Sequence, residues 1–260
     1  MADNHLIAKN TVFLYIRMLL SMGIYLYTTR VVLSILGVED YGIYNVVGGL
    51  VAMFSFLNAT MSGATSRFIT FELGKNSSKV QTVFSVALTI HIIIALIVFL
   101  IGETFGLWFL ENKLTIPATK MYEAKWLLQF SIVTMIFSFT QVPYNASIIA
   151  HEKMNIYAYF ELVNVGLKLL SVYLLLIIDA NKLIFYGAIV MLTQIGVTLL
   201  YRLYCTRKWE HCKFNLSLDR EFLRPLLSYS GWDLFGNASL VARTQGVNVL
   251  LNIFFGAILN

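Results

Sequence analysis

The sequence predicts an all-α polytopic membrane protein, and its composition and its long apolar runs are the two observations that predict it. Hydrophobic residues make up 58% of the 260 residues and charged residues only 13%, whereas soluble globular chains have about 45–50% and about 25%. So few charged side chains cannot cover the surface of a soluble protein of this size. Most of the surface must therefore face lipid.

Runs of about twenty apolar residues predict the helices in chain order. Six runs and a seventh, final run cover residues 10–36, 41–64, 80–102, 124–145, 155–178, 183–204 and 228–255. The first run is too long for a signal-peptide core and has no small-residue cleavage site, so we expect it to remain as a helix.

These runs indicate three parts of the chain. Residues 1–204 form a six-helix transmembrane lobe, residues 205–227 a cytoplasmic amphipathic linker, and residues 228–260 the first helix of a truncated second lobe. Asp219 is the expected N-cap of a short interfacial helix within the linker. A helix of similar length precedes both Gly37 and Gly256, which suggests that the second lobe repeats the first.

The net charge of +5 comes from Lys and Arg in short loops between apolar runs. Because these basic residues are not gathered on one solvated face, we expect no nucleic-acid partner. Lys and Arg are in excess in cytoplasmic loops of membrane proteins, and their distribution here places the N-terminus in the cytoplasm. Cys205 and Cys212 lie in one loop and are expected to be reduced. His211 beside them does not complete a metal site, so we expect no metal and no cofactor.

Polar side chains within the apolar runs indicate which helix faces lie inside the bundle, because an ionised group at mid-span costs roughly 2.5–3.5 kcal/mol on insertion scales. In the first helix, Asn10, Arg17, Ser21 and Thr28 are spaced by seven, four and seven residues. This spacing keeps them on one helix face. They form the first candidate substrate-binding stripe.

The fourth and fifth helices carry further candidates. Gln141 and Asn145 end a polar series on the fourth helix, and we expect these amides to line a cavity because back-bonding of hydroxyls does not account for them. The fifth helix carries Glu161, Asn164 and Lys168. Glu161 and Lys168 share a face but are about 10 Å apart along it, so each needs a partner from another helix.

The seventh helix is the most polar and cannot face lipid, and its candidates are Asp233, Asn237 and Arg243. Glu161 and Asp233 are the expected charge or coupling partners. The sequence leaves open whether Lys168 is neutralised by an acidic group such as Asp233 or by a phosphate of the substrate.

The remaining helices predict packing rather than a site. A small-residue stripe on the second helix indicates a close-packing seam: Asn45, Gly48, Ala52, Ser55, Ala59 and Ser62. The third and sixth helices are nearly all aliphatic, and His91 is expected to be a hydrogen-bonded core histidine, with a proton relay as the alternative. No catalytic motif or cluster of loop carboxylates occurs, so no enzyme is predicted.

Two stretches of the chain carry a resemblance to a known family. They are Leu36-Gly37-Val38-Glu39-Asp40-Tyr41-Gly42-Ile43-Tyr44 and Pro143-Tyr144-Asn145-Ala146, which runs on to Ala150-His151-Glu152-Lys153-Met154. With these stretches the sequence resembles bacterial polysaccharide biosynthesis proteins of the O-antigen flippase type, in the multidrug/oligosaccharidyl-lipid/polysaccharide exporter superfamily. The resemblance implies an inner-membrane protein of two six-helix lobes around a central cavity.

The resemblance also implies a cargo, a polyprenyl pyrophosphate that carries a short glycan and moves from the cytoplasmic to the periplasmic leaflet by alternating access. Arg17, Arg30, Lys168 and Arg243 would serve its phosphates, and Asn and Ser side chains its sugar hydroxyls. Arg30 could instead only snorkel to the interface. The implied partners are the lipid-linked oligosaccharide, membrane lipid and the glycan polymerase or assembly machinery.

Two alternatives remain open. A multidrug or cation antiporter of the same superfamily would need acidic groups in its cavity, whereas the in-span cations here outnumber the acids, which favours an anionic cargo. A non-transport scaffold or receptor would fit seven spans but explains less well why ionisable groups enter the membrane.

Overall fold

The computed structural model describes residues 2–75, 78–178 and 181–256, without the side chains of residues 2–10, 232 and 233. Within this part every regular element is helical and no strand occurs, which confirms the all-α prediction. The elements are α1 (Ala2–Ala52), α2 (Ser55–Gly74), α3 (Val80–Ile101), the π-helical turn η1 (Gly102–Gly106), α4 (Leu107–Asn112), η2 (Ala118–Lys120), α5 (Met121–Ala150), α6 (Met154–Ile177), α7 (Lys182–Lys208), η3 (Glu210–Cys212) and α8 (Arg220–Phe255).

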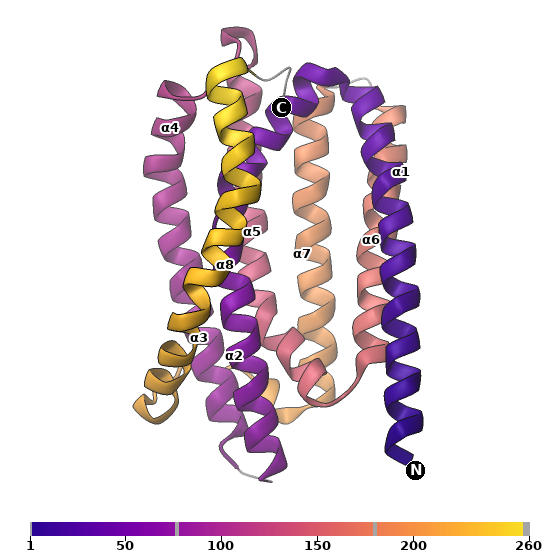
Figure 1. The fold of residues 1–260 in the computed structure, drawn as a ribbon, viewed down its shortest axis with the longest axis vertical. Coiled ribbons are helices and arrows are strands. Elements are labelled where there is room, and N and C mark those ends of the chain that lie inside the picture. Colours follow the sequence, from indigo (N-terminus) through magenta and orange to yellow (C-terminus); the bar gives the residue numbers. More distant parts are fainter. Residues whose placement is uncertain (1, 76–77, 179–180, 257–260) are drawn as a thin grey trace.

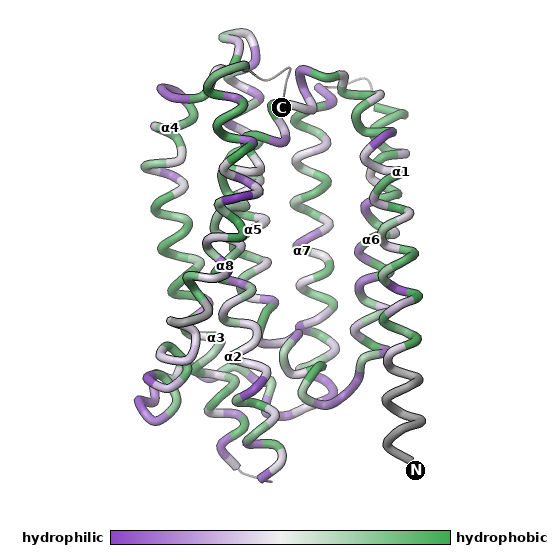
Figure 2. The backbone as a smooth tube through the Cα atoms, in the orientation of Figure 1, coloured by the Kyte–Doolittle hydropathy of each residue, from purple (hydrophilic) through white to green (hydrophobic). Residues whose placement is uncertain are grey.

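Five helical segments are long and apolar enough to cross a membrane, which indicates a multi-pass membrane protein. They are Thr11–Ala52, Val80–Asn112, Ala118–Ala150, Met154–Ile177 and Lys182–Lys208. The predicted second span, 41–64, is divided between the end of α1 and the start of α2, and the predicted seventh span lies within α8. Neither α2 nor α8 is among the five candidate segments. Figure 2 shows hydrophilic residues concentrated at the two ends of the bundle.

The boundary between the first two predicted helices lies at Gly37. Two helices meet within α1 at a kink at Gly37, which has φ 79° and ψ 170°, a conformation that breaks the helix and is favourable only for glycine. The predicted helix 41–64 is then interrupted by a turn at Met53 and Phe54, after which α2 continues to Gly74. The third predicted helix extends through η1 to Asn112.

The start of α8 differs from the predicted linker. Asp219 caps the helix as expected, since its carboxylate accepts a hydrogen bond of 2.9 Å from the Glu221 amide. However, α8 runs without interruption from Arg220 to Phe255, so the cap begins one long helix instead of a short interfacial one. Pro225 lies within its second turn, where it has no N–H group to donate to the Glu221 carbonyl oxygen.

The bundle has α5 and α7 at its centre (Figure 1). The N-terminal part of α1 packs along α6 on one side of this pair, while α2 and α3 pack against α5 on the other side and α8 packs on α2. Gly187 permits the close approach of α5 and α7, because a Cβ at this position would lie 2.6 Å from Leu127 Cδ2. This arrangement leaves space between the two sides, and the polar side chains described below line it.

The outward faces of the helices suit contact with lipid. On α3, Leu96, Ile97 and Leu100 are 58%, 50% and 54% exposed, while His91 on the opposite face is fully buried. His91 Nδ1 contacts the Ala87 carbonyl oxygen at 2.7 Å, which confirms the predicted core histidine. An exposed aliphatic face on so apolar a helix belongs in hydrocarbon rather than in water.

Helix α8 is tied to the rest of the bundle at both ends. Near its start, Lys79 Nζ lies 2.6 Å from a Glu221 carboxylate oxygen. Near its end, the side-chain oxygen of Asn252, which is fully buried, accepts a hydrogen bond of 3.0 Å from the Thr115 amide. These contacts hold α8 against the ends of α3 and α4 and fix the wall that it contributes to the site.

Candidate functional site

The candidate site is an uncharged polar cavity between the central helices. It consists of two adjoining hollows of about 400 Å³ and 300 Å³, which share Asn58, Ser138 and Gln194 in their walls. We call the pair the polar cavity, and its parts the first and the second hollow. Side chains from α1, α2, α5, α6, α7 and α8 line it.

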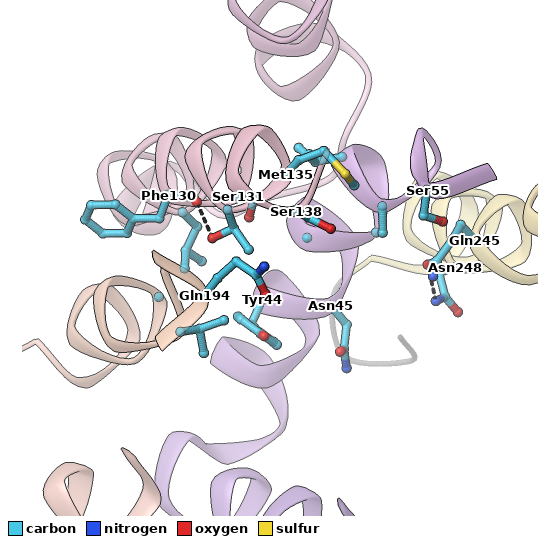
Figure 3. A pocket seen from close by; sticks show the side chains of 18 of the residues that line it. Tyr44, Asn45, Ser55, Phe130, Ser131, Met135, Ser138, Gln194, Gln245 and Asn248 are labelled. Atoms are coloured by element: carbon cyan, nitrogen blue, oxygen red, sulfur yellow. Dashed lines mark hydrogen bonds between the residues drawn. The ribbon is translucent and has the colours of Figure 1, made fainter. Parts of the chain in front are cut away.

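The first hollow lies where α1, α5, α7 and α8 face one another, and Figure 3 shows its side chains. Its polar members are Tyr44, Asn45, Ser55, Asn58, Ser131, Thr134, Ser138, Gln194, Gln245 and Asn248. Gly49 of α1 makes room for Gln245 of α8, because a Cβ on Gly49 would lie 3.0 Å from Gln245 Oε1. Asn248 Nδ2 in turn donates to that oxygen at 3.4 Å.

The wall shared by the two hollows is held by hydrogen bonds between helices. Asn58 Nδ2 of α2 donates to Ser138 Oγ of α5 at 2.9 Å. Gln194 Nε2 of α7 donates to Gln141 Oε1 of α5 at 2.9 Å, and Thr198 Oγ1 donates to the same oxygen at 3.1 Å. These bonds fix the donors and acceptors in place before any ligand arrives.

The second hollow keeps acceptors without partners. Its lining includes Asn145 of α5 and Asn164 of α6. The Oδ1 atoms of both residues, and Oδ1 of Asn58, are buried and have no hydrogen-bond partner among the described residues. A buried carbonyl oxygen without a donor costs about 1–3 kcal/mol. The three oxygens are therefore acceptors that a ligand with hydroxyl groups can satisfy.

The polar cavity offers hydrogen-bond donors and acceptors to a ligand, without a charged group in its described lining. Its lining residues are amides, hydroxyls, glycines and apolar side chains, and none of them is charged. Amide and hydroxyl groups both donate and accept hydrogen bonds, as sugar hydroxyls do.

Two of the predicted cations lie at the contact between α1 and α6, where aromatic rings are their partners. The Arg17 guanidinium is 4.9 Å from the ring centroid of Tyr157. Lys168 Nζ donates to the Tyr25 hydroxyl at 2.9 Å and lies 5.0 Å from the centroid of that ring. Lys168 thus has a partner from another helix, as the sequence requires, but the partner is a tyrosine.

The other predicted site residues are dispersed. Gln141, Asn145 and Asn164 line the second hollow, as expected of cavity residues. Thr28 donates to the backbone oxygen of its own helix at Tyr25. Four more residues lie away from the two hollows: the Ser21 hydroxyl is buried without a partner among the described residues, Asn237 donates to Thr60 Oγ1 at 3.1 Å, and Arg30 and Arg243 are exposed. The side chains of Asn10 and Asp233 lie outside the described part of the structure.

Glu161 is partly buried on α6. Among the described residues it forms no hydrogen bond or ion pair. The structure therefore does not bring Glu161 together with Lys168, and the distance expected along one helix face remains between them.

Sequence reasoning missed part of the cavity wall. The small-residue stripe with Asn45, Ser55 and Ser62 was expected to be a packing seam, but these residues line the two hollows. Gln194 was overlooked because its helix is otherwise largely aliphatic. The signal was present in both cases, since an amide within an apolar run needs a buried partner.

A second cluster of titratable groups lies outside the predicted spans, around η3. The His151 ring stacks on Trp209 with centroids 4.2 Å apart, and His211 lies 5.2 Å from His151. Burial lowers the pKa of His151 to about 4. A hydrogen bond from Cys205 lowers the pKa of the buried Cys212 thiol to about 6. Among the described residues, no group of three or more His, Cys, Asp or Glu side chains could hold a metal.

Comparisons with known proteins identify no relative of this chain. No family model matches it, and no curated protein and no solved structure is significantly similar to it.

Proposed function

We propose that this chain belongs to a bacterial inner-membrane flippase, which moves a polyprenyl-pyrophosphate-linked oligosaccharide from the cytoplasmic to the periplasmic leaflet by alternating access. Residues 1–204 would form one six-helix lobe, and α8 the first helix of a second lobe. The N-terminus would lie in the cytoplasm. The exported glycan would supply surface polysaccharide, including the O-antigen of lipopolysaccharide.

The observation that carries the proposal is the polar cavity between helices that are otherwise apolar. Its side chains can bind sugar hydroxyls, and the buried Oδ1 atoms of Asn145 and Asn164 have no other donor among the described residues. A purely structural bundle gains nothing from such unpaired acceptors, because each of them costs free energy. A glycan that passes through the bundle would satisfy them transiently.

The charges are consistent with an anionic cargo. Among the side chains that the structure describes, neither Arg17 nor Lys168 forms an ion pair with a carboxylate, and their partners are the aromatic residues Tyr157 and Tyr25. We assign them to the pyrophosphate, which would bind at the contact between α1 and α6. A drug or cation antiporter is favoured less, since the polar cavity has no carboxylate in its described lining.

The test is the sidedness of the lipid-linked oligosaccharide in cells depleted of the protein, measured by its accessibility to a periplasmic sugar-modifying enzyme. We expect the glycan to accumulate on the cytoplasmic leaflet. Normal sidedness together with increased sensitivity to lipophilic cations would instead favour the antiporter and would overturn the proposal.

Complementation with variants tests the residues. Asn164→Leu removes an acceptor of the polar cavity, and the loss of a hydrogen bond of about 1 kcal/mol should lower transport about fivefold. Val163→Leu changes the adjacent, exposed residue of the same helix and should transport normally. Arg17→Ala and Lys168→Ala should impair transport with membrane insertion intact. Wild-type transport in both of these variants would remove the two cations from the site.

A further inference from the structure

A second cavity in the bundle is entirely apolar. It has a volume of about 360 Å³ and lies between the end of α1, the start of α2, η1, α5 and α8. All of its lining residues are apolar, among them Phe54, Phe105, Ile132, Val241 and Ala242. We call it the apolar pocket. No group in its lining side chains can hydrogen-bond to a ligand, so only a hydrocarbon fits its chemistry.

The apolar pocket depends on two local irregularities of the helices. The turn at Met53 and Phe54 separates α1 from α2, and the π-helical turn η1 widens the helix that continues from α3 to α4. Gly102 in η1 approaches α5 so closely that a Cβ would lie 2.7 Å from Ile132 Cδ1. π-Helical turns are rare and occur frequently at functional sites.

The apolar pocket opens toward the lipid-facing surface. Phe105 and Ala242 on its rim are exposed, Phe105 by 54%. The rim is continuous along α3 with Ile97 and Leu100, which are 50% and 54% exposed and form part of the surface that suits lipid. A chain in the hydrocarbon of the bilayer can therefore enter the apolar pocket sideways without crossing a polar barrier.

The apolar pocket also adjoins the polar cavity, because Val51 lines both. Its α8 wall, Ala238, Val241 and Ala242, lies near the middle of a helix that extends from Arg220 to Phe255. A bulk phospholipid keeps its head group at the membrane surface. The apolar pocket lies at mid-bundle beside the polar cavity. A lipid whose chain occupies this pocket would therefore have its head group inside the protein, in the polar cavity.

We infer that the apolar pocket binds the isoprenoid chain of the cargo while the glycan occupies the polar cavity, with lateral entry between η1 and α8. This inference rests on the proposed function. The methyl branches of an isoprenoid make it bulkier than a straight acyl chain, and the apolar pocket beside η1, Phe54 and Phe105 offers about 360 Å³.

Photo-cross-linking tests the inference on the full chain in vesicles of phosphatidylethanolamine and phosphatidylglycerol. One probe is geranylgeranyl alcohol with a diazirine on its terminal isoprene unit, and the other is phosphatidylcholine with a diazirine on an acyl chain. We expect the isoprenoid probe to label peptides that contain residues 98–106 and 238–242, and unlabelled geranylgeranyl alcohol to compete. The acyl probe should label the exposed helix faces without this preference.

Two variants on neighbouring positions of α8 provide the matched comparison. Val241→Phe fills the apolar pocket and should reduce labelling by the isoprenoid probe about tenfold, equivalent to about 1.4 kcal/mol. Leu240→Phe adds a ring at a lipid-exposed position, 61% exposed in the wild type, and should leave labelling unchanged. Ala242→Leu fills the rim of the pocket and repeats the test if Val241→Phe folds poorly.

Equal labelling of Val241→Phe, Ala242→Leu and the wild type would overturn the inference, as would equal labelling of these peptides by the acyl probe. Because the probes carry neither glycan nor pyrophosphate, this result is independent of transport. If the isoprenoid probe labels the pocket in vesicles but glycan sidedness in depleted cells is normal, only the proposed function is overturned. Altered sidedness without labelling would overturn only the isoprenoid site.

Discussion

Gly37 and Gly256 adopt the same backbone conformation at the ends of two long helices. Gly37 has φ 79° and ψ 170°, and Gly256 has φ 78° and ψ −177°. Residues with side chains rarely occupy this region, which is essentially restricted to glycine. The two glycines also follow helices of similar length in the sequence, and the shared conformation supports the proposal that α8 begins a repeat of the first lobe.

We predict that Gly37→Ala and Gly256→Ala each lower the free energy of unfolding by about 1–3 kcal/mol, the usual cost of a strained backbone conformation. Steric overlap does not contribute, because a Cβ on Gly37 meets no atom within 4 Å and a Cβ on Gly256 only Thr115 Cγ2 at 3.8 Å. Denaturant titration of the purified protein measures both effects. Gly63→Ala, at an open helical position of α2, should stabilise. Equal stability of Gly37→Ala and Gly63→Ala would contradict the prediction.

A second pair of glycines tests the packing of the two central helices. Gly187→Ala should destabilise by about 1–3 kcal/mol, because its Cβ would lie 2.6 Å from Leu127 Cδ2 and 3.1 Å from Phe130 Cδ2. Gly196 lies on the same helix, and a Cβ there would meet no atom within 4 Å, so Gly196→Ala should stabilise by up to about 1 kcal/mol. Thermal unfolding of the two variants provides the comparison, and a shift of the same sign in both would show that α5 and α7 do not pack as described.

The helical class and the positions of most helices were predictable from sequence because long apolar runs have few alternatives in a membrane. The predicted fifth helix, 155–178, differs by one residue at each end from α6, Met154–Ile177. The errors lie where side chains carry no signal of backbone geometry. A turn at Met53 and Phe54 and a π-helical turn at Gly102–Gly106 depend on the packing of neighbouring helices, which a hydropathy run does not encode.

The candidate site was predicted only in part, since an in-span polar residue indicates the bundle interior but not its partner. Gln141 and Asn145 were expected to line a cavity, and they do. The stripe around Asn45 and Ser55 has the small residues of a packing seam, and a seam and a cavity wall are distinguished only by what lies opposite. For Lys168 the sequence suggested an acid or a phosphate, because the cation-binding role of a tyrosine such as Tyr25 has no sequence pattern.

The pH dependence of stability should report on His151. Burial, and then the charges of His211 and Lys153, lower its pKa to about 4, whereas an unfolded chain has a pKa of 6.5 there. Between these values the unfolded chain binds a proton that the folded chain does not, so stability falls as the pH falls through 6.5 toward about 4. His151→Phe keeps a ring on Trp209 and removes the titration. Its unfolding free energy should therefore vary less over this pH window, and an unchanged slope would contradict the assignment.

The contact between Lys168 and Tyr25 gives the last prediction. Tyr25→Phe removes the hydroxyl that accepts a hydrogen bond of 2.9 Å from Lys168 Nζ, and it leaves the ammonium group without that acceptor at the contact between α1 and α6. We expect the free energy of unfolding to fall by about 1–2 kcal/mol. In a Lys168→Met background the same substitution should cost little, because no cation remains to be satisfied. The difference between the two backgrounds measures the coupling directly.

Tyr27→Phe is the matched control on the same helix pair. The Tyr27 hydroxyl lies 3.4 Å from the Tyr173 hydroxyl, a longer contact between neutral groups, so its loss should cost less and should not depend on Lys168. Equal costs of Tyr25→Phe in both backgrounds would mean that the ammonium does not rely on Tyr25. If Lys168→Met retains full stability yet fails to support transport, the lysine is kept for the cargo and not for the fold, since a purely structural cation can be replaced by an apolar residue of similar size.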